Sequence, residues 1–311
     1  MNRLTLTILI GCLALSPSGL GAQSGSVREA RVGDLRLQFI DWGGRGQAVV
    51  LVPGGCDTAH VFGDVAPRLA GSFRVLSLTP RGCAGSDAPT EGYALDDQLR
   101  ELAGFLDSQG IRRAVLAGHS SGGGKITRFA RLYPDRVERL VYFDTVYSYI
   151  ADGLEEGINA AITRKLSRAT GDRFERFRAT EQAWELGVWS PAMERNARLS
   201  FEHKRPDGWW ASFRADMEAG RYFESAVHVP ALMFFASGLD TQRLKQFDAA
   251  TQATLRPLVD QTEAKRREQV EAFRRNGPHV QIVEMTGTSH YCFAHKPDEI
   301  AEAVIAFLRR Q

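Results

Sequence analysis

Short apolar runs alternate with amphipathic stretches along most of this chain. Residues 27–32 and 35–40 alternate apolar with polar positions around Gly33-Asp34, a pattern that predicts a β-hairpin. Runs typical of further strands follow at residues 48–52, 73–78, 114–117, 139–143, 231–236 and 280–284. The runs at 48–52 and 114–117 are apolar throughout, as expected of strands that are covered on both faces.

Amphipathic segments lie between these strands. Residues 95–106 carry leucine at positions 95, 99, 102 and 106, which is the spacing of one helix face. Helical patterns also cover residues 123–133, the long charged stretch 241–276 and the C-terminal segment 297–308. Strands that alternate with helices predict an α/β fold, in which a mostly parallel twisted sheet carries helices on both faces.

The pattern changes between residues 146 and 228. This span is rich in arginine and glutamate at helix-like spacing, and it holds many of the large aromatic residues: Trp184, Trp189, Trp209, Trp210, Phe213, Tyr222 and Phe223. It predicts a helical cap, residues 146–228, inserted into a core formed by residues 23–145 and 229–311. Most of these aromatic side chains are expected inside the cap, and two or three along a pocket, because ligand pockets are mostly apolar.

The N-terminus has the layout of a targeting segment. One charged residue, Arg3, precedes an apolar run at residues 4–15, and small, turn-prone residues then lead to Ala22. This layout predicts a signal peptide, residues 1–22, and an exported protein in the periplasm or outside the cell. The apolar run is short for a bilayer span, so stable membrane insertion is not expected.

Four cysteines bear on export and on disulfide bonding. Cys12 ends a Leu-Ile-Gly-Cys sequence that matches a bacterial lipoprotein cleavage box, so lipid anchoring is the alternative to cleavage after Ala22. Removal of the signal leaves Cys56, Cys83 and Cys292 in a compartment that permits disulfides. Because Cys56 and Cys83 each follow a predicted strand, and those strands should be neighbours, we hypothesise a disulfide that braces the two loops. Three free thiols are the alternative.

Composition narrows the class of protein. The 311 residues are 43% hydrophobic and 24% charged, which is ordinary for a soluble globular protein. The formal net charge is only +2, and no dense stripe of lysine and arginine carries aromatic residues between its charges. A nucleic-acid partner is therefore not expected. The sequence carries no indication of the oligomeric state.

One stretch carries a chemical motif. Gly118-His119-Ser120-Ser121-Gly122 follows a predicted buried strand, precedes a predicted helix and matches the G-x-S-x-G nucleophile elbow. Glycine is needed on both flanks because the chain turns sharply at the serine, and a Cβ there would collide with the neighbouring strand or helix. The turn exposes the Ser120 hydroxyl. It also places the Ser121 N–H at a helix N-terminus, where an oxyanion would form.

Further motifs accompany this elbow in a fixed order. They are Pro53-Gly54-Gly55 after the 48–52 strand, the turn Arg81-Gly82-x-x-x-Ser86, the stretch YPDRVERLVYFD at 133–144, and a glycine loop carrying His290 before the last helix. Together they cover about residues 48–308 and resemble the α/β-hydrolase superfamily of serine hydrolases, in its capped, single-domain form. The resemblance implies a Ser-acid-His triad and an oxyanion hole formed by the N–H groups of Gly55 and Ser121.

The triad residues follow from this order along the chain. Ser120 needs a base because a free hydroxyl is a poor nucleophile at neutral pH. His290 lies after the final strand, where the base of the family lies, whereas His119 is expected to be a packing residue. Two acids are candidates: Asp144 ends the strand next to the nucleophile strand, and Asp240 follows the next strand, the commoner location among relatives. We favour Asp144, and Asp240 stays the alternative.

These residues predict an exported hydrolase that cleaves a carboxylic ester, or a related acyl bond, of a small-molecule substrate through an acyl-enzyme intermediate. A lactonase, an amidase or peptidase, a thioesterase or a C–C hydrolase would use the same residues. A non-catalytic ligand-binding protein on this fold is the alternative of another class. The mechanism requires no cofactor, and no motif indicates a metal site.

Overall fold

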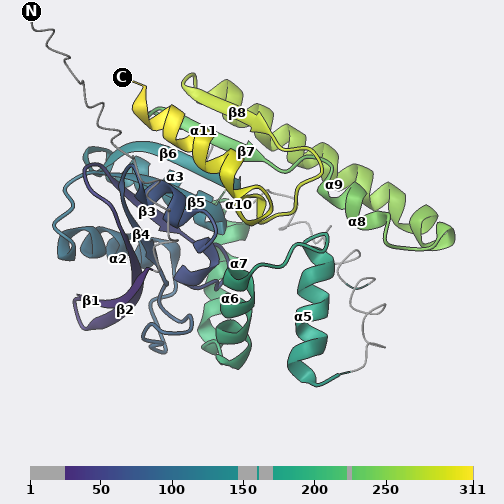
Figure 1. The fold of residues 1–311 in the computed structure, drawn as a ribbon, viewed down its shortest axis with the longest axis horizontal. Helices are drawn as coiled ribbons and strands as arrows, with labels where there is room; N and C mark the ends of the chain where they lie inside the picture. Colours follow the sequence, from purple (N-terminus) through teal and green to yellow (C-terminus); the bar gives the residue numbers. More distant parts are fainter. Residues whose placement is uncertain (1–24, 146–159, 161–170, 223–225, 311) are drawn as a thin grey trace, which may run out of the picture.

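The computed structural model describes residues 25–145, 160, 171–222 and 226–310 (Figure 1). The predicted signal peptide lies outside the described residues, as do residues 146–159, 161–170 and 223–225 of the predicted cap. The alternative lipoprotein site at Cys12 and the aromatic residue Phe223 therefore have no structural description.

Eight strands form one sheet, in the order β1-β2-β4-β3-β5-β6-β7-β8. Their bounds are β1 Ser26–Val32, β2 Leu35–Gly43, β3 Ala48–Val52, β4 Arg74–Leu78, β5 Ala114–Ser120, β6 Val137–Thr145, β7 Ala231–Phe235 and β8 Val280–Glu284. The β1–β2 and β2–β4 pairs are antiparallel, and the five remaining pairs are parallel. The mostly parallel α/β sheet predicted from the sequence is confirmed.

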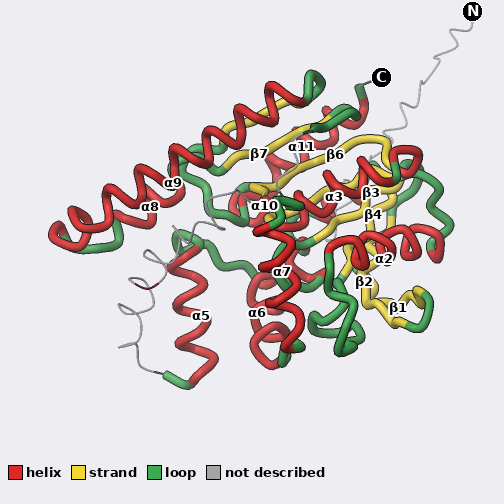
Figure 2. Tube along the Cα trace, turned by 180° about the vertical axis from the view of Figure 1, so that it is seen from behind, coloured by secondary structure: helices red, strands yellow, loops and turns green. Residues whose placement is uncertain are grey.

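Helices cover both faces of the sheet (Figures 1 and 2). They are α1 Ala66–Ala70, α2 Leu95–Ser108, α3 Ser121–Leu132, α8 Leu239–Leu244, α9 Ala249–Asn276, α10 Cys292–His295 and α11 Pro297–Arg309, together with the 3₁₀ turns η1 Ala59–Phe62 and η2 Pro134–Arg136. Buried side chains of α2, α3 and α9 pack on one face, and those of α1, α10 and α11 on the other. This is the predicted two-sided covering.

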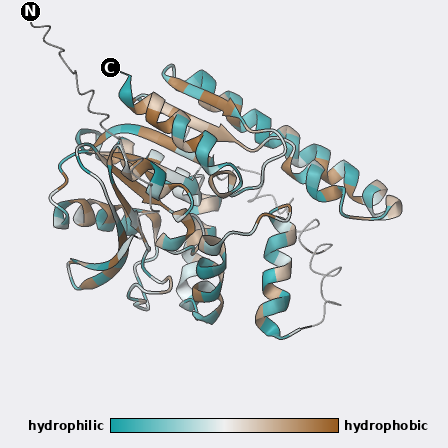
Figure 3. Cartoon of the chain, viewed as in Figure 1, coloured by the Kyte–Doolittle hydropathy of each residue, from teal (hydrophilic) through white to brown (hydrophobic). Residues whose placement is uncertain are grey.

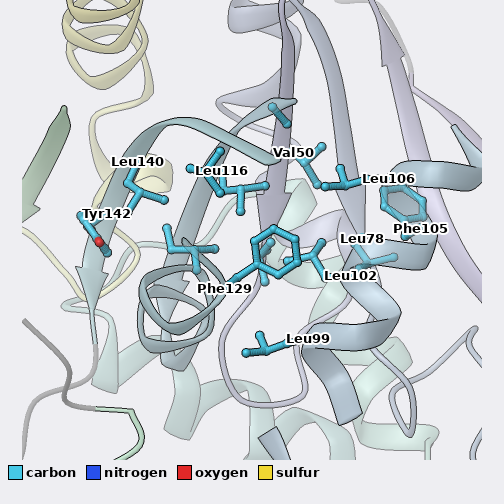
Figure 4. Packing of buried hydrophobic residues seen from close by; sticks show 14 of the residues in the cluster. Val50, Leu78, Leu99, Leu102, Phe105, Leu106, Leu116, Phe129, Leu140 and Tyr142 are labelled. Carbon is cyan, nitrogen blue, oxygen red and sulfur yellow. The ribbon is translucent and has the colours of Figure 1, made fainter. Parts of the chain in front are cut away.

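The central strands β3, β5 and β7 are apolar on both sides because helices cover both faces of the sheet. Along β3, Val50 and Val52 belong to one core cluster and Val49 and Leu51 to the other, because successive side chains of a strand point to opposite faces. Figure 4 shows the first cluster, where Phe129 and the α2 leucines meet strand residues such as Val50 and Leu116. In Figure 3 the strands are mostly hydrophobic, whereas α9 alternates hydrophilic and hydrophobic residues.

The long charged stretch 241–276 was predicted as one helical segment, and the structure corrects this. The stretch contains the end of α8, a turn, and α9, which begins after Asp248. The Asp248 side chain accepts a hydrogen bond from the Thr251 N–H at 2.9 Å, and this N-cap starts a new helix there.

Three described helices lie between β6 and β7, within the predicted cap: α5 Arg173–Trp184, α6 Pro191–Glu202 and α7 Asp207–Glu218. All three lie below the sheet in both views, with α5 to one side of α6 and α7 (Figures 1 and 2). Asp172 and Ser190 cap the starts of α5 and α6 by accepting N–H hydrogen bonds. Helix α6 packs on η1, which places the cap beside the loop that follows β3.

Candidate active site

The nucleophile elbow has the strained geometry that its glycines predict. Ser120 joins β5 to α3 with φ of 52° and ψ of −127°, a conformation rare for residues with a side chain. A Cβ on Gly118 would lie 2.5 Å from the Gly122 oxygen, and a Cβ on Gly122 would lie 2.3 Å from the Val52 oxygen. The backbone on both flanks is therefore too close for any other residue.

Two neighbouring segments hold the elbow in place. Thr145 Oγ1, at the end of β6, donates to the Ser120 carbonyl oxygen at 3.1 Å. On the other side, a Cβ on Gly54 would lie 2.4 Å from Ser120 Cβ, so the loop after β3 can approach only because residue 54 is glycine. Ser120 thus lies between the ends of β3 and β6.

The structure brings His290 to Asp144 and not to Asp240. The His290 Nδ1 atom lies 2.7 Å from Asp144 Oδ2, a hydrogen-bonding distance. Asp240 is fully buried elsewhere, where its Oδ1 accepts from Arg243 Nη1 at 2.9 Å. Of the two acids proposed from the sequence, only Asp144 has the contact that a triad acid makes.

Ser120 and His290 line one cavity. Among the hydrogen bonds of the described residues, none joins the Ser120 hydroxyl to the imidazole. Catalytic hydrogen bonds are often long without a substrate and tighten in the complex. The structure therefore places the serine and the histidine in a common cavity and joins the histidine to the acid.

The charge of Asp144 is stabilised although the residue is 1% exposed. Burial by itself raises the pKa of the carboxyl, but the Arg266 guanidinium, the His290 hydrogen bond and the Ala236 N–H outweigh it, and the pKa lies below its usual value. Ala236 N–H donates to Asp144 Oδ1 at 2.9 Å. Asp144 is thus an ionised buried acid.

Burial and neighbouring charges also act in opposite directions on the pKa of the His290 imidazole. Burial lowers its pKa, but the hydrogen bond and charge of Asp144 and the charge of Glu185 raise it, and the net pKa lies above the ordinary value. An imidazole held by a carboxylate in this way has a fixed orientation and a stabilised charged form.

The two proposed oxyanion donors occupy adjacent positions. The Gly55 N–H donates to Ser121 Oγ at 2.8 Å, and Gly55 has φ of 49°, which glycine adopts readily. Ser121 is the first residue of α3, so its own N–H lies at the helix N-terminus. The structure therefore joins the two loops that carry these donors.

His119, the variable residue of the elbow, packs as expected. It is 1% exposed, and its ring centroid lies 4.5 Å from that of His290 and 4.6 Å from that of Tyr291. Its Nε2 atom lies 3.3 Å from the His290 carbonyl oxygen. Burial keeps its pKa well below the ordinary value, so the ring is a neutral support beneath the loop of His290.

The cavity has a volume of about 600 Å³, and cap and core residues line it together. Three of the aromatic residues named from the sequence contribute to its wall: Trp184, Trp189 and Trp210. Trp209, by contrast, is buried against Cys83 and Tyr93. Five charged side chains also line the cavity: Asp57, Glu181, Glu185, Arg205 and Arg243.

The hypothesised disulfide is confirmed. Cys56 and Cys83 are bonded, with their Cα atoms 5.3 Å apart, and Cys292 is a buried free thiol. The bond joins the loop after β3 to the loop after β4. Since Gly55 precedes Cys56, the disulfide fixes the loop of one proposed oxyanion donor.

Several site residues gave no signal in the sequence. Asn196 of α6 donates to Asp57 Oδ1 at 2.7 Å and accepts from the Thr58 N–H at 2.7 Å. Arg266 of α9 contacts Asp144. These residues lie in α6 and α9, where no motif marks them.

Across the described residues, no group of three or more His, Cys, Asp or Glu side chains is arranged to hold a metal ion. Among the helices in the described ranges, none is long and apolar enough to cross a membrane.

Comparison with curated proteins finds relatives that match part of the chain. A bifunctional epoxide hydrolase 2 of Mus musculus is 33% identical over 116 residues, which are 36% of this chain and 21% of that protein. A 2-hydroxy-6-oxononadienedioate/2-hydroxy-6-oxononatrienedioate hydrolase of Burkholderia vietnamiensis is 36% identical over 113 residues, 35% of this chain and 39% of that protein. The matched part is well under half the length of either relative.

Solved structures match nearly the whole chain at low identity. The structure of E-2-(acetamidomethylene)succinate hydrolase has a TM-score of 0.66 and 21% identity, and the match covers 92% of this chain and all of that one. An epoxide hydrolase of Bacillus megaterium has a TM-score of 0.67 and 15% identity over 91% of this chain. These matches concern the fold. A model described as the alpha/beta hydrolase family matches residues 49–303, most of the sequence, and the chain therefore belongs to that family.

Proposed function

We propose that this hydrolase cleaves a carboxylic ester, or a related acyl bond, by a serine mechanism with Ser120 as nucleophile, His290 as base and Asp144 as acid. The observation that carries the proposal is the 2.7 Å contact between His290 and Asp144, beside the cavity that Ser120 also lines. A strained elbow serine, an imidazole and an ionised buried carboxylate are the parts that such a mechanism needs.

The proposed chemistry has two stages. His290 Nε2 takes the proton of the Ser120 hydroxyl while the oxygen attacks the acyl carbon, and it then gives this proton to the leaving group. Water, deprotonated by the same imidazole, then attacks the acyl carbon; the bond to the Ser120 oxygen breaks, the imidazolium returns its proton to that oxygen, and the acid product leaves. The N–H groups of Ser121 and Gly55 are the proposed donors to the oxyanion; the Gly55 N–H, which donates to Ser121 Oγ at 2.8 Å, would turn to the substrate oxygen instead. Loss of one such donor typically costs about 3 kcal/mol of barrier.

The lining of the cavity supports a small, polar substrate. A volume of about 600 Å³ is typical of pockets for small molecules. A long alkyl chain in the cavity would remove water from these five charged side chains and offer them no hydrogen bonds in its place. That exchange would cost free energy. We therefore propose an acyl substrate with polar groups, held between aromatic side chains such as Trp184 and Trp189.

A C–C hydrolase is the second candidate. The Burkholderia vietnamiensis relative is named as the hydrolase of a dioate, a compound with two carboxylates. Arg205 and Arg243 line the cavity of this chain and could attract such anions, although Arg243 already pairs with Asp240. The match to that relative is partial, so the ester substrate stays the first proposal.

A substrate panel tests the proposal. Polar acyl esters, lactones, aminoacyl amides and a vinylogous dioate are assayed with the wild type and with Ser120→Ala. We expect ester turnover by the wild type and a loss of at least about 10³-fold in the variant. Absence of both turnover and fluorophosphonate labelling of Ser120 would favour a non-catalytic binding protein.

Two further variants test the acid. Asp144→Asn should lower kcat by about 10⁴-fold, because the imidazole would lose its fixed tautomer. Asp240→Asn should keep most of the turnover, since Asp240 pairs with Arg243 away from His290. The reverse result would assign the acid to Asp240.

We also propose that the protein is exported and that residues 1–22 are removed. Export in a bacterial host followed by intact-mass measurement should give a chain that begins at Gln23. A mass that includes lipid on Cys12 would instead support the lipoprotein alternative.

A further inference from the structure

Helix α9 carries a buried arginine to the acid of the proposed triad. Arg266 is 1% exposed, and its Nη2 donates to Asp144 Oδ1 at 3.0 Å and lies 3.2 Å from Oδ2. The same nitrogen donates to the Ala236 carbonyl oxygen at 2.8 Å. A buried charge of this kind costs free energy unless it is paired, and here it pairs with the carboxylate that also binds His290.

We propose that Arg266 is a positioning residue of the active site, which holds Asp144 in the orientation that His290 requires and limits the basicity of the imidazole. This inference rests on the proposed function, because it assigns Arg266 a role in the Ser120, His290 and Asp144 mechanism.

The orientation of the Asp144 carboxylate follows from three hydrogen bonds that form a ring with Arg266 and Ala236. Arg266 Nη2 donates to the Ala236 carbonyl oxygen, the Ala236 N–H donates to Asp144 Oδ1, and Oδ1 accepts from Arg266. These three contacts fix Oδ1 at the end of β7. Rotation of the carboxylate would break two of them, so Oδ2 is left directed at His290 Nδ1.

The effect of Arg266 on the basicity of the His290 imidazole follows from its positive charge. When His290 takes the Ser120 proton, the imidazole becomes a cation beside Asp144. Without Arg266, this cation would meet an uncompensated carboxylate. With Arg266 present, the carboxylate already has a cationic partner, so the imidazolium gains less and returns its proton to the leaving group more readily. The charge of Arg266 should thus keep His290 neutral at a lower pH than Asp144 alone would allow.

Other ionisable groups also act on this pair, and each stays in place when only Arg266 is changed; Glu263 is the one whose pKa Arg266 itself lowers, so its titration changes together with the guanidinium. Those that act on His290 and Asp144, or on Arg266 itself, come from the loop after β3, from β5, from α8 and α9, and from segments beside them: Asp57, His119, Glu185, Arg243, Glu263 and Cys292. A shift seen on replacement of Arg266 therefore reports the guanidinium.

The experiment measures kcat/KM against pH for full-length variants. Arg266→Met removes the charge and the hydrogen bonds, and Arg266→Gln is a second neutral variant in case the first does not fold. In the neutral variant, we expect the midpoint of the fall in kcat/KM at low pH to move upward by about one pH unit. The plateau should fall at least about tenfold because Asp144 loses its orientation.

Arg266→Lys separates the orientation of Asp144 from the effect of the positive charge on His290. A lysine keeps the charge but lacks the planar fork of the guanidinium, so the acid limb should stay near that of the wild type while the plateau falls. The matched control is Arg267→Met, one residue along α9. The Arg267 side chain is 57% exposed and pairs with Glu284 on the surface, so its profile should match the wild type.

A titration of His290 by NMR in the Ser120→Ala background keeps this inference distinct from the proposed function. The measurement needs no turnover. A His290 pKa that is the same with Arg266 and with a folded neutral variant would overturn the charge effect, even if Ser120 proves to be the nucleophile. Unchanged turnover of Ser120→Ala would instead overturn the proposed function, whatever the titration gives.

Discussion

His290 combines burial with a strong partner, and its protonation should set the activity at low pH. Burial disfavours the charged imidazole, whereas Asp144 at 2.7 Å and the charge of Glu185 favour it, and the net effect raises the pKa. Only the neutral imidazole can accept the Ser120 proton. The pKa of one residue thus determines the pH range in which the proposed nucleophile can be activated.

The pKa of His290 should appear as the pH at which kcat/KM falls on the acid side of its pH profile. As pH falls through the raised His290 pKa, the imidazole becomes protonated and kcat/KM should fall, with its midpoint above 6.5, the ordinary histidine value. A pH profile from 5 to 9 with a neutral ester measures it. A midpoint clearly below 6.5 would show that burial, and not Asp144, dominates the environment of the base.

At the scale of elements, loops after neighbouring strands meet at the elbow through close backbone contacts. The loop after β3 passes over Gly122 and Ser120, and the disulfide ties it to the loop after β4. Backbone atoms at these distances leave no room for a Cβ. The proposed oxyanion site therefore depends on the relative placement of whole strands and loops.

Gly122→Ala tests this dependence. The new Cβ would lie 2.3 Å from the Val52 oxygen, so the loop after β3 must shift, at a cost of about 1–3 kcal/mol. We expect a lower Tm and at least a tenfold loss of kcat. Gly71→Ala is the matched control: its φ is −64°, and its Cβ would come no closer than 3.6 Å to another atom. Equal effects of the two substitutions would contradict the steric argument.

Reduction of the disulfide tests the second connection between loops. Cys56 and Cys83 are 27 residues apart, and closing a loop of that length is worth roughly 3–4 kcal/mol in the chain-entropy model. We expect reductant to lower the Tm of the wild type. The Cys56→Ala/Cys83→Ala variant should have a low Tm both with and without reductant. A wild-type Tm that is the same with and without reductant would argue against a stabilising disulfide.

At the scale of the whole molecule, residues from the helices between β6 and β7, which belong to the predicted cap, line the cavity together with residues at the edge of the sheet. Phe177 and Trp184 come from α5, Asn196 from α6, and Ser120 and His290 from the core. Asn196 is 7% exposed and bonds to both Asp57 and Thr58 of the loop after β3. This side chain therefore joins the cap to the loop that carries Gly55.

Asn196→Ala should loosen this junction. Three buried hydrogen bonds would be lost and polar groups of Asp57 and Thr58 left unpaired, each at a cost of about 1–3 kcal/mol. We expect a lower Tm, faster proteolysis within the cap and a raised KM. Arg195→Ala, at an exposed position of the same helix, should behave as the wild type. Loss of kcat without any change in proteolysis would contradict a docking role.

The local pattern of the sequence determined the strands, the helices α2, α3 and α11 and the elbow, whereas it joined α8 to α9 and did not mark the short helices α1 and α10. Alternating and continuous apolar runs reflect the burial of each strand face, and this burial is a property of single segments. Glycines around Ser120 are required by the local backbone, so the proposed nucleophile could be chosen from five residues. The order of motifs then indicated His290, and the positions of Cys56 and Cys83 after neighbouring strands suggested their bond.

The tertiary structure decided which distant side chains meet. Asp144 lies near the end of β6, Asp240 follows the adjacent strand β7, and the two have the same chemistry, but only the fold shows that Asp144 faces His290 while Asp240 faces Arg243. Arg266 and Asn196 lie in helices that no motif marks, and their roles depend on how α9 and α6 pack against the sheet. Contacts between residues more than 100 positions apart depend on packing of the whole chain, which no local pattern encodes.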